Sequence, residues 1–252
     1  MGKKWTREDI IIAYALYCVI PFSKLNNSNK TIKEVAEKID RSPASLKMKI
    51  CNLAALDTDF LASGRTGLTG GISRLDKEVF AEFSGDWQRL SSLAEDLVEM
   101  PLFDIAEPIY NGPSARKKKT YAEISEKQAR RFFRKSVIAA YEGRCCITGM
   151  TVPDLLIASH IKPYYASDET ERANPANGLL LNAFYDRAFD KGLMTVLPDL
   201  TIKVSDAVRE LYTDEKTREW LLDVEGSKIK RPGRFAPRRE LLEYHNKYIF
   251  LR

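Results

Sequence analysis

The feature that most constrains the fold is a break in the middle of the chain. Residues 101–120 hold three prolines, a glycine and a run of lysines, a composition that favours an irregular connection over a helix or a strand. The 252 residues are enough for one large domain or two small ones. We therefore expect a helical domain at about 1–100, a basic linker at 101–120 and a second domain at 121–252.

The composition is that of a folded protein in a reducing compartment. Apolar residues make up 44% and charged residues 30% of the chain, a mixture that can bury a core and excludes wholesale disorder. The longest apolar stretch, 10–22, is too short to span a bilayer, and no signal peptide is recognisable. Four cysteines, of which Cys145 and Cys146 are adjacent, do not make a disulfide framework. We expect a cytoplasmic protein with no membrane contact.

Positive charge is concentrated in one part of the sequence. The chain has 40 basic and 35 acidic residues, and residues 101–140 alone carry 9 basic and 4 acidic side chains. Part of this excess lies on a helix expected at 122–141, where Arg130, Arg131 and Arg134 need not pack inward. Such a block suits a polyanion, because cations placed on phosphates release condensed counterions. A solvated linker is the alternative explanation.

Helical periodicity and capping residues predict several helices in the first half of the chain. They are expected at 6–20, 31–39, 43–55 and 75–99. The second and third are joined by a short polar turn, as in a helix-turn-helix unit, which would place Arg41, Lys47 and Lys49 on or near the exposed side that reads DNA. Helix pairs of this kind also occur in many proteins that never contact DNA.

Residues 144–196 hold four short motifs. Their sequences are Arg144-Cys-Cys-Ile-Thr-Gly149, Leu155-Leu-Ile-Ala-Ser-His-Ile-Lys-Pro163, Asn174-Pro-Ala-Asn-Gly-Leu-Leu-Leu-Asn182 and Ala183-Phe-Tyr-Asp-Arg-Ala-Phe-Asp-Lys-Gly192. Taken together, the motifs resemble the HNH endonuclease family. This resemblance implies a ββα-metal fold, in which a two-stranded hairpin and a helix surround one divalent cation.

The expected architecture follows from these two halves. The fold class is α+β and mostly helical, with an N-terminal helix-turn-helix-like domain and a C-terminal ββα-metal nuclease domain. Strands are expected near 145–162, for the hairpin, and near 193–204.

The resemblance assigns catalytic roles to two residues. His160 is expected to be the general base, and a histidine suits this role because its unperturbed pKa of about 6.5 is close to working pH. Without the motif, a core histidine with a satisfied hydrogen bond would be the better interpretation. Asn177 matches the asparagine that holds the hairpin loop and keeps the base oriented, although asparagine before glycine is also an ordinary turn residue.

The same resemblance implies a cation held by carboxylate. Asp186 occupies the position of the family's second histidine and is expected to be the main metal ligand, since its hard oxygen suits Mg²⁺ or Mn²⁺. Asp190 lies one helical turn further on and is a candidate second ligand or a supporting acceptor. Two positions depart from the family pattern: Ser159 replaces an acidic residue or histidine, and Tyr185 stands where some relatives have histidine. The complete ligand set is therefore open.

Two further expectations concern zinc and phosphate. Many relatives hold a structural zinc with two cysteine pairs, but these are missing here, so we expect no structural zinc. Four cations around the motifs are candidates for phosphate contact, with solvated surface as the alternative: Arg144, Lys162, Arg187 and Lys191.

The leading hypothesis is a metal-dependent endonuclease that cuts double-stranded DNA, and the resemblance suggests restriction of foreign DNA. A second copy of the chain and a separate methyltransferase are conceivable partners. The alternative from another class is a DNA-binding or regulatory protein with a decayed HNH unit, which Ser159 and Tyr185 favour. RNA cleavage is a weaker third option.

Overall fold

The computed structural model describes residues 3–103, 121–211 and 214–252. Its helices are α1 (Arg7–Val19), α2 (Lys30–Lys38), α3 (Pro43–Ala54), α4 (Thr58–Ala62), α5 (Arg74–Phe83), α6 (Trp87–Val98), α7 (Tyr121–Ala140), α8 (Glu169–Arg172), α9 (Ala183–Asp190), α10 (Asp206–Leu211), α11 (Glu215–Leu222) and α12 (Arg239–Tyr248). Two antiparallel sheets pair β1 (Leu156–His160) with β2 (Gly178–Asn182) and β3 (Met194–Val196) with β4 (Ile202–Val204). The α+β, mostly helical fold class is confirmed.

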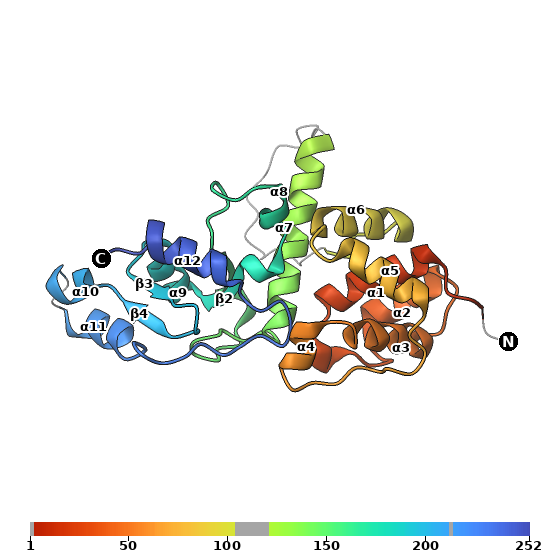
Figure 1. Cartoon of the computed structure of the whole chain (residues 1–252), viewed down its shortest axis with the longest axis horizontal. Coiled ribbons are helices and arrows are strands. Elements are labelled where there is room, and N and C mark those ends of the chain that lie inside the picture. The colour runs from red at the N-terminus through yellow and green to blue at the C-terminus, as the bar shows by residue number, and fades with distance from the viewer. Residues whose placement is uncertain (1–2, 104–120, 212–213) are drawn as a thin grey trace.

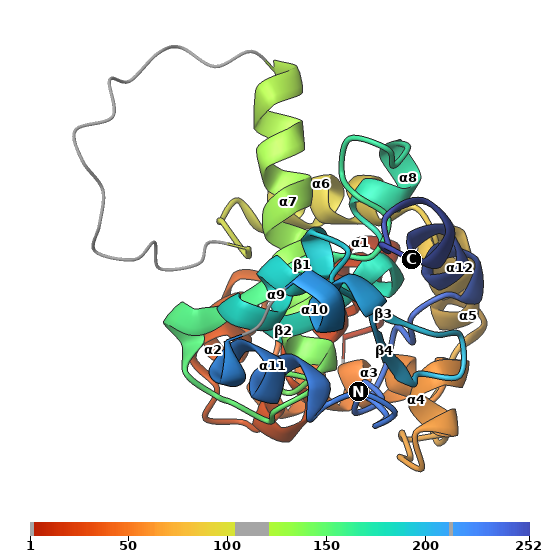
Figure 2. The ribbon, with the colours of Figure 1, turned by 90° about the vertical axis from the view of Figure 1, so that its left-hand side faces the viewer.

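Helix α7 stands between the two halves of the molecule (Figure 1), and in the view turned by 90° its upper turns rise above the neighbouring α6 and α8 (Figure 2). It packs on α1 and α6 on one side and on β1 and β2 on the other. Phe132, Phe133 and Val137 are fully or almost fully buried along it, as its amphipathic pattern predicts. Since a single hydrophobic cluster runs from α1 through α7 to the second half, the halves share one core.

Local signals explain the N-terminal helices. Thr6 and Asp9 form the predicted capping box of α1, and Ser42 caps α3 with a proline in the first turn. The single helical stretch expected at 75–99 is in fact two helices. It is interrupted at Gly85, which has a φ of 111°, and α6 restarts at the N-cap Asp86.

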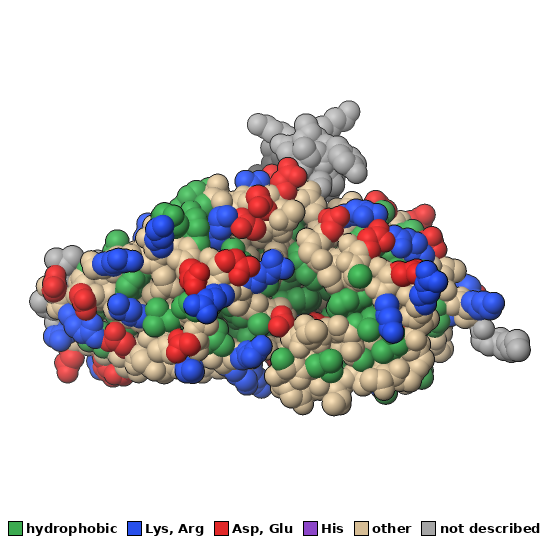
Figure 3. Space-filling view, viewed as in Figure 1, with side chains coloured by type: hydrophobic (Ala, Val, Ile, Leu, Met, Phe, Trp, Pro, Cys, Tyr) green, Lys and Arg blue, Asp and Glu red, His purple; other side chains and the backbone are tan. Residues whose placement is uncertain are grey.

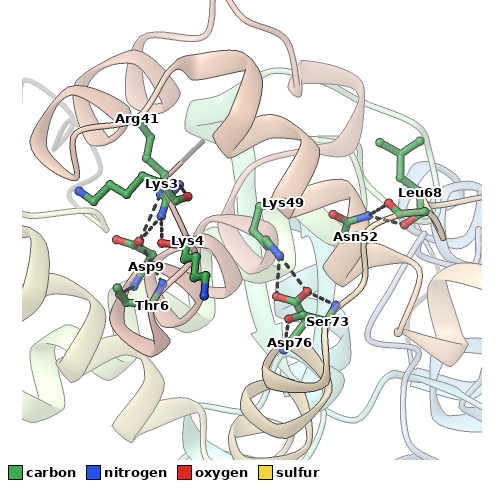
Figure 4. Close-up of polar contacts among 11 residues, drawn as sticks. Lys3, Lys4, Thr6, Asp9, Arg41, Lys49, Asn52, Leu68, Ser73 and Asp76 are labelled. Atoms are coloured by element: carbon green, nitrogen blue, oxygen red, sulfur yellow. Dashed lines mark hydrogen bonds and ion pairs between the residues drawn. The ribbon is translucent and has the colours of Figure 1, made fainter. Parts of the chain in front are cut away.

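The expectation that Arg41 and Lys49 lie on an exposed DNA-reading side is wrong. The Arg41 guanidinium is 4% exposed, pairs with Asp9 at 2.7 Å, and lies 3.9 Å from the centre of the Trp5 ring. The Lys49 ammonium pairs with the fully buried Asp76 at 2.8 Å (Figure 4). Both cations are held inside the N-terminal domain because each has an acidic partner far away in the sequence, whereas Lys47 stays partly exposed on α3.

The hairpin also differs from its expected position. The segment 145–155 contains no strand, and β1 pairs instead with β2, with His160 opposite Gly178. The connection between them, 161–177, contains the short α8 and a single 3₁₀ turn at Pro175–Asn177. Every residue of β2 is buried, so the strand lacks the polar alternation by which an exposed strand is recognised. The strands expected near 193–204 are confirmed as β3 and β4.

Two other expectations can be compared with the structure. Cys145 and Cys146 are buried free thiols. Of the linker expected at 101–120, the structure describes only residues 101–103, in which Leu102 and Phe103 are buried. The lysine-rich part of this linker lies outside the described residues. None of the helices that the structure describes is long and apolar enough to cross a bilayer.

A buried arginine joins the end of the chain to the first helix. Figure 1 shows the segment between α11 and α12 crossing towards α4, and there the Ala236 amide donates to the Asp59 carboxylate at 2.9 Å. Arg234, 1% exposed, donates to the carbonyl oxygens of Tyr17 and, at 2.5 Å, Ile20. These carbonyls lie at the C-terminal end of α1, where the helix dipole favours a cation.

We expect Arg234→Met to lower the free energy of unfolding by about 2–4 kcal/mol, because the carbonyls of Tyr17 and Ile20 lose a charged donor while they stay buried. The measurement is chemical denaturation at neutral pH. Arg238→Met, at a side chain that is 53% exposed, is the matched control and should change stability by less than about 0.5 kcal/mol. Equal losses for the two variants would contradict the role of Arg234.

Candidate active site

The hairpin and the helix after it bring the predicted base and the predicted metal ligands to one cavity. Asn182 ends β2 and its side chain caps α9 by accepting from the Tyr185 amide at 2.9 Å, so α9 starts directly at the strand end. His160 from β1 and Asp186 and Asp190 from α9 line a cavity of about 420 Å³. Strand β1, the loop after it, α9 and the end of α12 thus line the space beside the predicted base and the predicted metal ligands.

His160 is held in one orientation. Its ring stacks on Phe133 of α7, with ring centres 3.8 Å apart and an angle of 10° between the planes. Its Nε2 lies 3.0 Å from the carbonyl oxygen of Arg172, which can only accept, so Nε2 carries the proton and Nδ1 keeps a lone pair. Burial lowers the pKa of His160, which keeps the imidazole neutral near pH 7.

Asn177 fixes the loop that follows β1. Its side chain is fully buried; Oδ1 accepts from the Lys162 amide at 2.8 Å, and Nδ2 donates to the Lys162 carbonyl at 3.2 Å and to the Ser167 hydroxyl at 3.2 Å. One amide therefore holds both ends of the connection between the strands. Asn177 itself does not line the cavity, so its contacts are those of a loop clamp beside the base.

The carboxylates of α9 lie in a partly dehydrated environment. Burial raises the pKa of Asp186, the neighbouring Asp190 raises it further, and the nearby Ser159 hydroxyl lowers it. Partial loss of hydration also raises the pKa of Asp190, which stands at the exposed rim, while Arg187 and Lys191 oppose that rise. Two carboxylates that repel each other beside a cavity are the groups a cation would stabilise.

The residues present fit a divalent cation in one further respect. Ser159 is 4% exposed and lines the cavity, yet its Oγ has no well-oriented hydrogen-bond partner. Because this hydroxyl is close enough to Asp186 to lower the pKa of the carboxyl, a cation or an ordered water held by Asp186 would also complete its hydrogen bonding. Within the described residues, however, no group of three or more His, Cys, Asp or Glu side chains is arranged to hold a metal.

Two of the predicted phosphate contacts reach the cavity. Arg187 and Lys191 line it and are exposed, on the same helix as the two aspartates. Arg144 is exposed next to the buried cysteines and is not part of the cavity lining. Arg187 and Lys191 are therefore the cations best placed to contact a strand bound there.

The other predicted cations already have partners. The Lys162 ammonium pairs with Glu171 at 2.6 Å, and Arg130 pairs with Glu126 at 2.8 Å. Arg134 donates to the Leu156 carbonyl at 3.1 Å, and Arg131, on the same helix, is partly buried. On the face seen in Figure 3, basic and acidic side chains are interspersed over both halves, without a continuous basic surface.

Sequence reasoning missed two aromatic neighbours of the base. Phe133 stacks on His160, and the ring of Tyr164 meets His160 edge-on, with centres 5.7 Å apart. In the sequence, Phe133 has the pattern of an ordinary core residue of an amphipathic helix. The pattern therefore does not indicate that Phe133, rather than Phe132, contacts the base. Tyr164 directly follows Ser-His-Ile-Lys-Pro, and this closeness to the motif was the available signal.

The comparisons with known proteins agree with this geometry. A family model described as HNH endonuclease matches residues 145–197, which include β1, β2 and α9. This segment of the chain is thus similar to an HNH endonuclease unit. The match indicates a nuclease-type function, and members of the family act on DNA and typically use a divalent metal. No curated protein matches the chain.

The second histidine, His245 on α12, serves the structure. It is 1% exposed, stacks on Phe189, donates from Nε2 to the Phe189 carbonyl at 3.2 Å and accepts at Nδ1 from the Thr195 hydroxyl at 2.8 Å. Burial lowers its pKa to about 4. Its ring therefore fastens α12 to α9 and β3 in the neutral form only.

This arrangement predicts a pH dependence of stability. Because the folded pKa of His245 lies below the unfolded value of about 6.5, the unfolded state binds more protons, and the free energy of unfolding falls as pH drops from about 6.5 to 4. The contribution should reach about 3 kcal/mol at pH 4. In His245→Gln, denaturation curves measured across this window should show a shallower loss, and curves parallel to those of the unaltered protein would contradict the prediction.

Proposed function

We propose that the chain is a metal-dependent endonuclease that hydrolyses phosphodiester bonds in double-stranded DNA. The observation that carries the proposal is the cavity lined by both His160 and Asp186, within the segment that matches the HNH endonuclease model. The DNA backbone is anionic, so hydrolysis needs a base for water and positive charge near the phosphate. The cavity offers groups for both.

His160 is the proposed general base. Since Nε2–H donates to the Arg172 carbonyl, Nδ1 is the nitrogen that accepts a proton from water. Phe133 supports the ring face and the low pKa keeps the imidazole unprotonated, so the base is ready near neutral pH. The imidazolium that forms is stabilised by the same carbonyl.

Asp186 is the proposed main ligand of a divalent cation, Mg²⁺ or Mn²⁺, with Asp190 and the Ser159 hydroxyl in supporting positions. When bound, the cation would supply the positive charge that offsets the transition state and the leaving oxygen. Asp186 and Asp190 would hold it through hard oxygen atoms, and Ser159 would orient a water. Arg187 and Lys191 would contact the flanking phosphates.

The biological role proposed is restriction of foreign DNA. It is supported by the nuclease-type family match and by the attached helical half, which would select or position the duplex. A single unit of this kind cuts one strand, so a second copy of the chain would serve double-strand cleavage. A separate methyltransferase would protect host DNA if unmodified sequences are the target.

A second candidate function is DNA binding by a unit that has lost catalysis. Two observations favour it: Ser159 precedes the base where relatives have a ligand, and no trio of metal-ligating side chains is found in the described part of the chain. Plasmid incubation with Mg²⁺, Mn²⁺ or EDTA separates the two. Nicking that requires the metal supports the nuclease, whereas gel shifts without any cleavage support the binder.

We expect His160→Ala to lower the cleavage rate by about 10²–10⁴-fold while DNA affinity stays nearly unchanged, because the variant lacks the base but keeps the surrounding cations. Cleavage of a labelled duplex gives the rate, and fluorescence anisotropy in EDTA gives the affinity. His245→Gln is the matched control in the chain's other histidine, and it should retain most of the activity at neutral pH. Full activity in His160→Ala would refute the assignment.

We expect Asp186→Ala to lose metal-dependent cleavage and most Mn²⁺ binding while the fold survives, since the position is only partly buried. Calorimetric titration with Mn²⁺ tests the binding directly. Asp154→Ala, at an exposed aspartate outside the cavity, is the control and should bind as the unaltered protein does. Unchanged Mn²⁺ binding in Asp186→Ala would remove this residue from the site.

A further inference from the structure

The hydrogen bond that orients His160 comes from an unusual place. The accepting carbonyl belongs to Arg172, the last residue of α8, which is a helix of four residues inside the long connection between β1 and β2. A helix this short has little stability of its own. The position of the carbonyl must therefore be fixed by contacts that reach α8 from outside.

The side chain of Arg172 makes such contacts with Tyr164. Its Nε donates to the Tyr164 carbonyl at 3.2 Å, and its guanidinium lies 4.8 Å from the centre of the Tyr164 ring. A guanidinium held against an aromatic ring gains cation–π attraction that grows as water is excluded. The residue whose carbonyl orients the base is thus fastened to the loop on the other side of the base.

Tyr164 is in turn fastened to α7. Its hydroxyl donates to the Glu126 carboxylate at 2.8 Å, and Arg130, which pairs with the same carboxylate at 2.8 Å, lies 4.1 Å from the Tyr164 ring centre. The Tyr164 ring also contacts the His160 ring edge-on, which connects these side chains to the imidazole. Two guanidinium groups, one phenol and one carboxylate thus connect α7, the loop and α8 around the imidazole.

We propose that this set, Glu126, Arg130, Tyr164 and Arg172, positions the general base: it holds the Arg172 carbonyl against Nε2–H, so that Nδ1 faces the cavity. Tyr164 is the central positioning residue, because it contacts both arginines, the carboxylate and His160. The role in catalysis rests on the proposed function, whereas the effect on the imidazole does not. None of the four side chains needs to touch DNA for this role.

Packing against Phe133 alone would not determine which nitrogen of His160 carries the proton. Phe133 fixes the plane of the imidazole by stacking, but stacking is equally compatible with a 180° flip about the Cβ–Cγ bond, which exchanges Nδ1 with Cδ2, and with a proton on either nitrogen. Only a directional acceptor distinguishes the two nitrogens. The Arg172 carbonyl is that acceptor, and Tyr164 with its partners holds the Arg172 side chain, while Asn177 and Lys162 hold the preceding Glu171.

The test uses the fact that the chain has only two histidines. Long-range nitrogen–proton NMR spectra of the full protein report which nitrogen of His160 carries the proton. The spectrum of His245→Gln shows which of the two sets of histidine signals belongs to His160. In the unaltered protein we expect a single Nε2–H form with a slowly exchanging proton. Tyr164→Ala should shift the His160 signals towards those of a mobile imidazole that averages both forms, and Tyr164→Phe, which keeps the ring, should shift them less.

Tyr165→Ala is the matched control, because this neighbouring tyrosine is 79% exposed and has no contact in the set. It should leave the His160 spectrum unchanged. Should Tyr164→Ala fail to fold, judged by its melting curve, Arg172→Gln provides the same test. An unaltered His160 spectrum in a folded variant of Tyr164 or Arg172 would overturn the proposal.

Kinetics give the second readout. Positioning predicts that Tyr164→Ala lowers kcat by about 10–100-fold with little change in KM, and that Tyr164→Phe recovers most of the loss. Arg74→Ala, at an arginine of α5 that is 93% exposed and pairs with Glu78, should leave kcat unchanged. A rise in KM with kcat unchanged would mean that Tyr164 contacts DNA instead. If the unaltered protein cuts no nucleic acid, the proposed function fails, and the NMR result alone decides the positioning role.

Discussion

The close approach of β2 to α7 at Gly178 is the contact on which the site depends. A Cβ atom there would lie 2.3 Å from Val137 Cγ2 and 3.1 Å from Phe133 Cζ, so only glycine lets the strand reach the helix. Gly178 is also the residue that pairs with His160, and Phe133 is the ring on which His160 stacks. One missing side chain therefore sets the distance between the shared core and the candidate active-site cavity, and His160 lies where the two meet.

How much the sequence can predict depends on whether the signal is local. Capping residues mark the start of a helix within a few residues of sequence, as Thr6 and Asp9 do for α1 and Ser42 and Pro43 do for α3. Those helices are found where expected. The segment around His160 and Asp186 could be placed from its motifs, and both residues line one cavity; their chemical roles remain proposals. The burial of Arg41 and Lys49 could not be predicted, because their acidic partners are 32 and 27 residues away. The local sequence around a buried cation does not differ from that around a solvated one.

The cavity combines groups suited to acid–base chemistry with departures from the HNH pattern that this segment resembles. His160 has its proton fixed on one nitrogen, and two carboxylates share a partly dehydrated wall, which is the separation of roles that acid–base chemistry requires. Ser159 brings a neutral hydroxyl to a position where charge is common in relatives. A cation bound here would have fewer charged protein ligands and more water, so its affinity would depend on the substrate phosphate as well as on the protein.

Arg234 has a consequence for how the chain can be divided. The boundaries at about 100 and 120 remain a prediction, but the final third of the chain supplies the guanidinium that closes the C-terminal end of α1. An excised segment 145–197 would lack α7, on which its strands pack. An isolated helical half would lack Arg234, so the carbonyls of Tyr17 and Ile20 would lose their donor. Because of these shared contacts, we expect the HNH-like segment and the helices beside it to fold only as parts of the same chain.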